Sequence, residues 1–161
     1  MVVSLHLESL KHNSHYRKEQ LSQLYASLDE NSENILCGDF NFCSTWTEEQ
    51  KILGNLYQDV WPLLFPQQPH QPTIGTWIFL QFSYNFLNFF LFFSQSLLGV
   101  CYPSDQYSPA RFDRILAKSQ YFIPTYIKLL GNQIITNKNG LDVYPSDHLG
   151  LYCEFNKISV T

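Results

Sequence analysis

Charged residues are scarce in this 161-residue chain: 15% are Asp, Glu, Lys or Arg, and none lies between Val60 and Ser104. Basic residues are the scarcer kind, since 10 Lys and Arg stand against 14 Asp and Glu, a formal net charge of −4 at pH 7. A protein that coats nucleic acid without sequence preference needs many basic side chains to replace the counterions of the phosphates. The composition therefore argues against that class, but it leaves room for a focused phosphate site.

Closely spaced cysteine pairs are also absent. The four cysteines, Cys37, Cys43, Cys101 and Cys153, include no CxxC pair, and two of them lie in apolar, strand-like runs. We therefore expect buried, reduced thiols rather than disulfides or a zinc site. The chain shows no basic stretch followed by a long apolar run at its start, and no N-x-S/T sequon. These absences favour an intracellular protein, in the nucleus or the cytoplasm.

The apolar residues that are present, 45% of the chain, predict a globular domain with a sizeable core. Met1–Glu8 alternates apolar and polar side chains, which predicts a strand with Leu5 and Leu7 on one face and His6 and Glu8 on the other. Further strands are predicted at Asn34–Gly38, Arg111–Lys118, Tyr126–Leu130 and Leu149–Phe155.

Two segments predict helices. Ser14–Leu28 has apolar residues at helical spacing and predicts an amphipathic helix with Ser14 as its N-cap. Thr47–Leu53 predicts a short helix, capped by Thr45 or by its own first residue. Pro62–Pro72 is rich in proline and predicts a loop. Strands separated by helices and loops favour a mixed α/β sandwich.

The segment Trp77–Val100 is a long apolar run rich in Phe and Leu. It has about the length that a bilayer-spanning helix needs, roughly 20 residues. Polar residues such as Gln81, Asn85 and Asn88 interrupt it, however, and no Lys or Arg flanks it. A membrane helix is therefore the weaker interpretation. The alternatives are an atypical apolar insertion at residues 78–100 or a translated intron, because Phe, Leu and Ser codons are rich in pyrimidines.

The sequence Gly38-Asp39-Phe40-Asn41 follows a predicted strand and forms the first candidate site. It places a carboxylate and an amide on the same side of a tight turn, which suits proton transfer beside an oriented phosphate. An Asx turn that merely closes the strand is the structural alternative, and for this motif taken alone it is the favoured one.

A second candidate site is the sequence Ser146-Asp147-His148, which precedes an apolar strand. An imidazole can polarise or protonate a substrate near neutral pH when a carboxylate fixes its tautomer. Asp113 lies among apolar residues in the middle of another predicted strand, and a carboxylate there needs a hydrogen-bonding partner. His148 is a candidate for that partner, although an Asp-His pair in a turn is more often structural.

A third group, His6-Leu7-Glu8-Ser9, closes the first predicted strand. His6 and Glu8 share a face, and the Ser9 hydroxyl could donate a hydrogen bond to a phosphate oxygen. Alone, this group carries little information.

The order of these motifs along the chain is more specific than any one of them. HLES is followed by a helix with QLxxL, then ILCGDFN, DVW, TW, RFDRIL and PSDHLGLYCEF. This order resembles the distal part of the endonuclease/exonuclease/phosphatase superfamily, closest to its tyrosyl-DNA phosphodiesterase group. The resemblance covers about Val2–Trp77 and Pro109–Phe155, while residues 78–100 have no counterpart in it. It implies an α+β fold, half of a DNase I-like four-layer α/β sandwich that lacks its N-terminal half, so that residues 1–161 form a partial domain.

The resemblance implies one of the two facing sheets and four catalytic residues. Asp39 would be the general acid/base that handles the proton of the nucleophilic water, and Asn41 would orient that water and the scissile phosphate. His148, held by Asp113, would stabilise charge on the phosphate oxygens.

Substrate and metal contacts follow from the same resemblance. His6 and Ser9 would contact the phosphate, and Trp77 would line the channel for a nucleic acid or protein–DNA phosphodiester substrate. Mg²⁺, or Mn²⁺ as an alternative, would bind at Asp147, with Glu8 as a second candidate ligand.

The main departure from the superfamily is a missing metal ligand. The family's principal ligand, a Glu, and an Asn nearer its start both precede the region equivalent to Met1, and neither has a counterpart here. With so few protein ligands we expect weak binding of Mg²⁺ and no phosphodiesterase activity from the chain alone.

The favoured function is therefore that of a Mg²⁺-dependent phosphodiesterase that processes 5′-tyrosyl DNA ends in DNA repair, present as an inactive fragment. Another phosphoesterase of the superfamily, of the abasic endonuclease, deadenylase or sphingomyelinase type, is the first alternative. A non-catalytic fragment that associates with a membrane or a partner through residues 78–100 is the second, and a membrane partner is the less favoured of the two.

Overall fold

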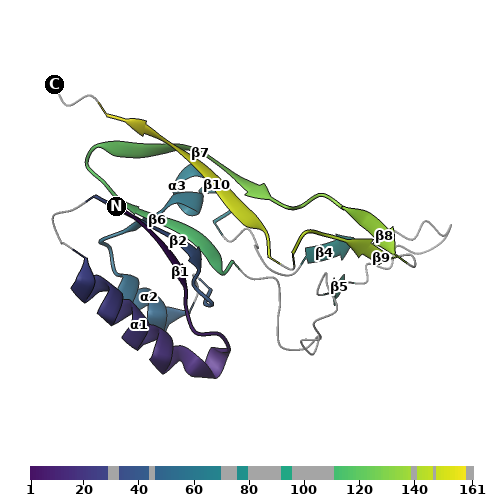
Figure 1. The fold of residues 1–161 in the computed structure, drawn as a ribbon, viewed down its shortest axis with the longest axis horizontal. Helices are drawn as coiled ribbons and strands as arrows, with labels where there is room; N and C mark the ends of the chain where they lie inside the picture. The colour runs from purple at the N-terminus through teal and green to yellow at the C-terminus, as the bar shows by residue number, and fades with distance from the viewer. Residues whose placement is uncertain are drawn as a thin grey trace.

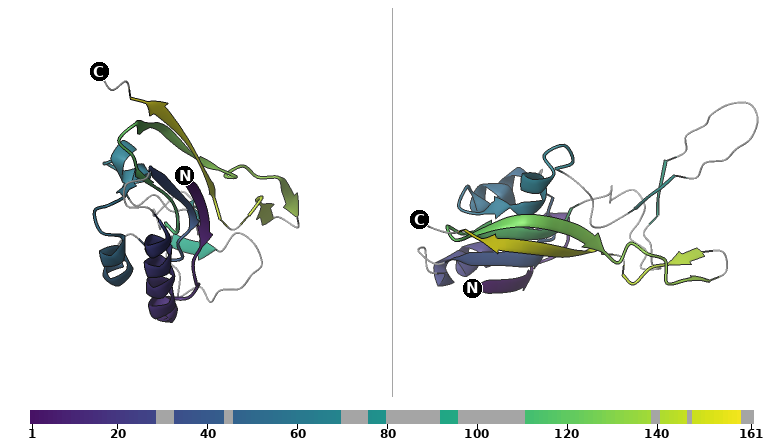
Figure 2. Two further views of the ribbon diagram at one scale, coloured as in Figure 1. Left: turned by 60° about the vertical axis from the view of Figure 1, so that its left-hand side comes forward. Right: turned by 90° about the horizontal axis from the view of Figure 1, so that it is seen from above.

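Two β-sheets lie face to face in the computed structural model, and helices cover the outer side of one of them (Figures 1 and 2). The structure describes residues 1–28, 33–43, 46–69, 76–79, 92–95, 111–138, 141–146 and 148–158. The mixture of helices and strands agrees with the α+β class predicted from the sequence.

The larger sheet has four strands in the order β1-β2-β6-β3. They are β1 (Val2–His6), β2 (Asn34–Asp39), β6 (Asp113–Lys118) and β3 (Gln58–Asp59). β1 runs parallel to β2, whereas β6 is antiparallel to both of its neighbours. Periodicity predicted the first three of these strands, but not the short strand β3.

Two helices cover the outer face of this sheet: α1 (Ser14–Ser27), entered through the 3₁₀ turn η1 (Lys11–Asn13), and α2 (Thr47–Leu53). A core cluster joins the sheet to the helices and consists of Leu7, Leu21, Leu36, Phe40, Phe42, Leu53 and Leu116. Each of these side chains is at most 5% exposed. The predicted face of Leu5 and Leu7 is therefore the helix side of the sheet.

The predicted helices are confirmed, but their predicted caps are wrong. Ser14 is the first residue inside α1, and Asn13 occupies the cap position without a side-chain bond. The turn η1 leads directly into α1, so the backbone before the first residue of the helix is already in a helical conformation. Trp46 precedes α2, again without a side-chain cap, and Thr45 lies outside the described residues.

The smaller sheet is an antiparallel ribbon of two strands, β7 (Phe122–Leu130) and β10 (Gly150–Lys157). A register shift interrupts the pairing between Glu154 and Phe155. The helix α3 (Val60–Leu64) packs beside the ribbon (Figure 1). Both layers and α3 share a second core cluster, whose buried members are Val60, Trp61, Ile115, Ala117 and Ile127.

Two sequence predictions are corrected here. The segment Pro62–Pro72 does not begin as a loop, because Pro62 to Leu64 belong to α3. Proline is tolerated in a first helical turn, where its missing N–H would have no partner. The chain also does not supply a single sheet, since β7 and β10 lie across the second core cluster from β2 and β6.

Four short strands complete the described fold. β4 (Thr76–Phe79) pairs with β5 (Phe92–Gln95), and β8 (Thr136–Lys138) pairs with β9 (Leu141–Val143), both antiparallel. The alternative of a membrane helix over Trp77–Val100 does not agree with strands at β4 and β5. Within the described ranges, no helix combines the length and the apolar character needed to cross a bilayer.

Candidate active site

Three predicted site residues form a row across neighbouring strands of the larger sheet. In the strand register, His6 of β1 is paired with Asp39 of β2, and Asp39 is paired with Asp113 of β6. Paired residues point to the same face of a sheet. The helix-side core contains the alternate positions Leu7, Leu36 and Leu116, so the row faces the two-stranded ribbon.

The turn after Asp39 is fixed by hydrogen bonds from Asn41. The Asn41 N–H donates to Asp39 Oδ1 at 2.7 Å, which is the Asx turn considered from the sequence. The Asn41 side-chain amide donates to the Leu7 carbonyl at 2.8 Å and ties the turn to the end of β1. Asn41 has a φ of 53°, a left-handed conformation that Asn tolerates better than most residues.

Gly38 allows β1 and β2 to approach closely beside this turn. Its φ is +137°, and a Cβ at this position would lie 1.9 Å from the backbone oxygen of Leu5. Any other residue would therefore push β1 away from β2 and move His6 relative to Asp39.

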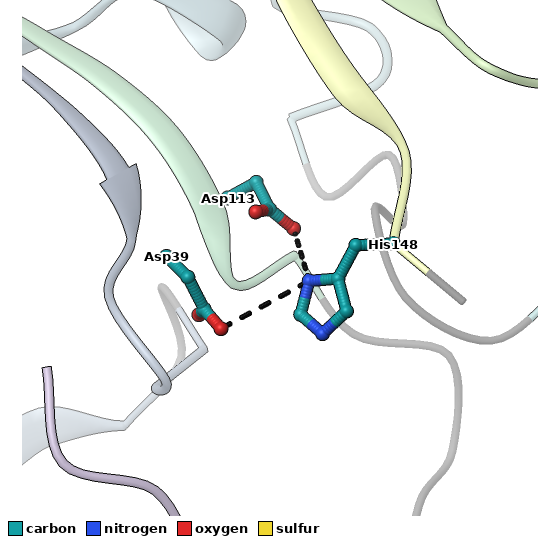
Figure 3. Close-up of side chains that lie close together, drawn as sticks. All are labelled: Asp39, Asp113 and His148. Carbon is teal, nitrogen blue, oxygen red and sulfur yellow. Dashed lines mark hydrogen bonds and ion pairs between the residues drawn. The ribbon is translucent and has the colours of Figure 1, made fainter. Parts of the chain in front are cut away.

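His148 reaches the row from the facing ribbon, just before β10. Its Nδ1 lies 2.9 Å from Asp113 Oδ2 and 3.9 Å from Asp39 Oδ2. Figure 3 shows the ring edge with Nδ1 turned toward both carboxylates. The predicted partnership of His148 with Asp113 is thus present, and it joins the two sheets.

The site is only partly shielded from water. The side chains of Asp39 and Asp113 are 13% and 17% exposed, and that of His148 is 27% exposed. Burial raises the pKa of Asp39, and the nearby Asp113 carboxylate raises it further, while the Asn41 N–H and the two histidines oppose the shift. A carboxyl group with a raised pKa is suited to exchanging protons with a substrate.

His6 and Ser9 are both exposed. His6 Nε2 is 3.6 Å from Asp39 Oδ2, and its side chain is 73% exposed. Ser9 is exposed in the segment between β1 and η1. Both side chains can therefore meet a ligand in solution.

Of the other predicted site residues, Glu8 does not join the cluster. The Glu8 carboxylate accepts a hydrogen bond from the Asn13 side chain at 3.0 Å and lines a hollow with residues of α1. Trp77 belongs to β4, but its side chain lies outside the described part of the structure, as does Asp147 as a whole. The part of the chain that the structure describes has one metal-ligand group, Asp39, Asp113 and His148, whose ligand atoms lie within 4.8 Å of one another.

Comparison with known proteins agrees with the fold. No family profile matches the chain. It is 28% identical over 164 residues to tyrosyl-DNA phosphodiesterase 2 of Xenopus laevis, covering 98% of this chain and 38% of the relative. It also matches the crystal structure of D. rerio TDP2 complexed with single-strand DNA product, with a TM-score of 0.59, 26% identity, and coverage of 96% and 55% of the two chains.

The chain is a homologue of tyrosyl-DNA phosphodiesterase 2. It corresponds to the C-terminal half of TDP2 and spans about half the length of the solved TDP2 chain, less of the Xenopus protein. The human Nocturnin catalytic domain with bound sulfate has the same fold, with a TM-score of 0.58 at 18% identity, and coverage of 98% and 47%. The fold is therefore half of a DNase I-like sandwich, as the TDP2-like motif order predicted.

Two buried arginines beside the candidate site of this TDP2 homologue were missed in the sequence. Arg17 and Arg114 are 0% and 1% exposed and donate hydrogen bonds behind the site residues. One signal was available: Arg17 lies one helical turn before Leu21, on the apolar stripe of α1, where a charged residue needs a buried partner.

Proposed function

We propose that this chain is the C-terminal part of a metal-dependent phosphodiesterase of the endonuclease/exonuclease/phosphatase superfamily that processes 5′-tyrosyl DNA ends in DNA repair. Homology to TDP2 supports the class of enzyme, and the DNA product held by a TDP2 structure supports a nucleic acid or protein–DNA substrate. The observation that carries the proposal is the meeting of Asp39, Asp113 and His148 from three separate segments of the chain. An enzyme of this kind acts in the nucleus or the cytoplasm.

The cluster suits hydrolysis of a phosphodiester. Water attacks phosphorus and gives up a proton to Asp39, whose pKa is raised. The bond to the leaving oxygen breaks, and that oxygen takes up the proton from Asp39 or from solvent. Nδ1 of His148 is turned toward Asp113, and we assign Nε2 the contact with a phosphate oxygen. Asn41 positions water and phosphate beside Asp39.

His6, Ser9 and Trp77 would bind substrate. His6 and Ser9 contact phosphate oxygens. Trp77 lines the path of the nucleic acid from β4. Asp147, next to His148 in the sequence, is proposed as the metal ligand of this half of the domain.

The described residues do not by themselves form a good Mg²⁺ site. Mg²⁺ prefers octahedral oxygen ligands, whereas the cluster offers two carboxylates and one imidazole. In addition, His148 Nδ1 is already bonded to Asp113. We therefore propose that Mg²⁺, or Mn²⁺, which accepts nitrogen ligands more readily, binds firmly only when further oxygen ligands are supplied.

The experiment that tests the proposed function compares the chain alone with the chain supplied with the N-terminal half of a TDP2 homologue. We expect residues 1–161 alone to release no tyrosine from a 5′-tyrosyl oligonucleotide in Mg²⁺ or Mn²⁺. Activity should be gained on complementation and be lost with Asp39→Asn. Activity of the chain alone that Asp39→Asn abolishes would contradict the fragment proposal. Hydrolysis only of abasic DNA, poly(A) or sphingomyelin would contradict the substrate class.

Residues 78–100 are proposed to be an insertion relative to the TDP2 group. Sequencing of the mature transcript tests this proposal. A continuous message through these codons in abundant RNA supports a translated insertion. Messages that lack them show that the segment is a retained intron.

A further inference from the structure

Arg17 is a fully buried cation whose hydrogen-bonding groups are all used. Its Nε and Nη2 donate to Glu49 Oε1 at 3.0 and 2.7 Å. Its Nη1 donates to the carbonyls of Glu8 and Leu10 at 3.0 and 2.6 Å, and Nη2 also donates to the Lys11 carbonyl at 3.2 Å. The side chain therefore holds three of the seven backbone carbonyls in the segment between β1 and α1.

Glu49 is ionised in this pair. Burial opposes its ionisation, but hydrogen bonds from Arg17 and Ser14 outweigh that effect and lower the pKa of the Glu49 carboxyl. The ring of Trp46 lies 5.4 Å from the guanidinium carbon and closes the pair from a third side. Removing either partner would leave an unpaired charge in the core.

Arg114 is a second buried cation, on the helix side of β6. Its Nη2 donates to the Phe42 carbonyl at 2.7 Å, and its Nη1 donates to Gln50 Oε1 at 3.2 Å. Its guanidinium carbon lies 4.5 Å from the centre of the Phe42 ring. Burial lowers the pKa of Arg114 to about 10, so the group still carries its charge at neutral pH.

Both arginines donate to α2, and each also donates to the backbone of a different loop. Glu49 and Gln50 are consecutive residues of α2, and each accepts from one arginine. Arg17 holds the segment that follows β1, and Arg114 holds the end of the turn that follows β2. Those two loops also contact each other through the bond from Asn41 to the Leu7 carbonyl.

We propose that Arg17, Arg114 and α2 form a positioning unit that sets the spacing between His6 at the end of β1 and Asp39 at the end of β2. None of the three touches the reacting groups. They act by fixing the backbone from the helix side of the sheet, while His6, Asp39 and Asp113 lie on the other side. This positioning role does not depend on which ligand the site binds. Its importance for catalysis rests on the proposed function.

The test uses amide hydrogen exchange by NMR on the whole chain, which needs no activity. Arg17→Lys keeps the charge but cannot make the five planar donations. Gln50→Ala removes one of the two acceptors of Arg114 and leaves the Phe42 carbonyl in place. The control is Ile127→Ala, a core truncation in the second cluster, chosen because it destabilises the chain without touching either loop.

We expect the backbone amides of Leu7 and Asn41 to lose protection by more than about tenfold in Arg17→Lys and Gln50→Ala, while amides of β7 and β10 change little. In Ile127→Ala, the amides of β7 and β10 should lose more protection than those of Leu7 and Asn41. Uniform loss of protection in all three variants, or no local loss in Gln50→Ala, would overturn the proposal. If these results hold and the complemented protein still cleaves no phosphodiester, the proposed function fails and the positioning unit stands.

Discussion

Asp113 Oδ2 and His148 Nδ1 are 2.9 Å apart although the residues are 35 positions apart and belong to opposite layers. The pair is thus both a candidate catalytic unit and a bond between the two sheets. We expect Asp113→Ala and His148→Ala to be non-additive, with a coupling of about 0.5–3 kcal/mol in the free energy of unfolding. A double-mutant cycle by urea denaturation measures it. The exposed pair of Glu48 and Lys51 should show a much weaker coupling, because solvent screens it. Equal couplings would contradict the bond across the layers.

Replacing Asp39 by Asn should stabilise the chain at neutral pH. Because burial raises the pKa of Asp39, the folded state loses stability as the pH rises from the ordinary value of 3.8, and the loss is complete above the folded pKa. We expect Asp39→Asn to increase the free energy of unfolding by about 0.5–2 kcal/mol at neutral pH. The gain should shrink near pH 3.8, where both states approach protonation. A gain that is constant with pH in urea titrations would rule out this cause.

Gly38→Ala should be far more costly than Gly131→Ala. Both glycines have positive φ, but a Cβ at Gly38 meets the Leu5 oxygen at 1.9 Å, whereas the nearest atom to one at Gly131 is Pro145 Cγ at 3.8 Å. We expect losses of more than about 3 kcal/mol for Gly38→Ala and about 1–2 kcal/mol for Gly131→Ala. Thermal unfolding compares the two variants, and similar losses would show that backbone strain alone matters.

The described thiols should react slowly. Cys37, Cys43 and Cys153 are free, as the sequence predicted, although they are half-buried rather than buried. Burial raises the pKa of all three, and burial together with Glu154 raises that of Cys153 to about 11. Since the thiolate is the reactive form, we expect alkylation at neutral pH to be more than about tenfold slower in the folded chain than in urea. Mass spectrometry of a Cys101→Ser variant measures this rate, and fast labelling of native Cys153 would contradict it.

Periodicity was sufficient to predict the strands and helices that carry the site. Side chains alternate in Met1–Glu8, and apolar residues recur at helical spacing from Ser14 to Leu28. Both patterns indicate that one face of the element is buried, and such a pattern can be recognised within a short stretch of sequence. The predicted N-cap at Ser14 was wrong because the 3₁₀ turn η1 directly precedes Ser14, which therefore lies inside the helix. No side-chain pattern in the sequence predicts that turn. Pro62 was predicted to lie in a loop because proline disfavours most helical positions. It is tolerated in a first helical turn, but the sequence did not show that a helix begins just before it.

The candidate site required information beyond local pattern. Neither Asp39 nor His148 was specific alone, and only the order of motifs suggested that they meet. The strand register then places Asp39 beside Asp113, and the packing of the ribbon brings His148 to both. Arg17 and Arg114 could not be paired with Glu49 and Gln50 in advance, because these contacts join residues 32 and 64 positions apart.

Among the described strands, β7 and β10 pair only with each other, and Tyr126 and Tyr152 on this ribbon are more than 40% exposed. Two-stranded sheets have little stability of their own. This layer should therefore open as a separate cooperative unit, at a lower free energy than the helix-covered sheet. Each such opening carries the imidazole away from its carboxylates, so the stability of the ribbon sets the fraction of time for which the proposed catalytic group is assembled.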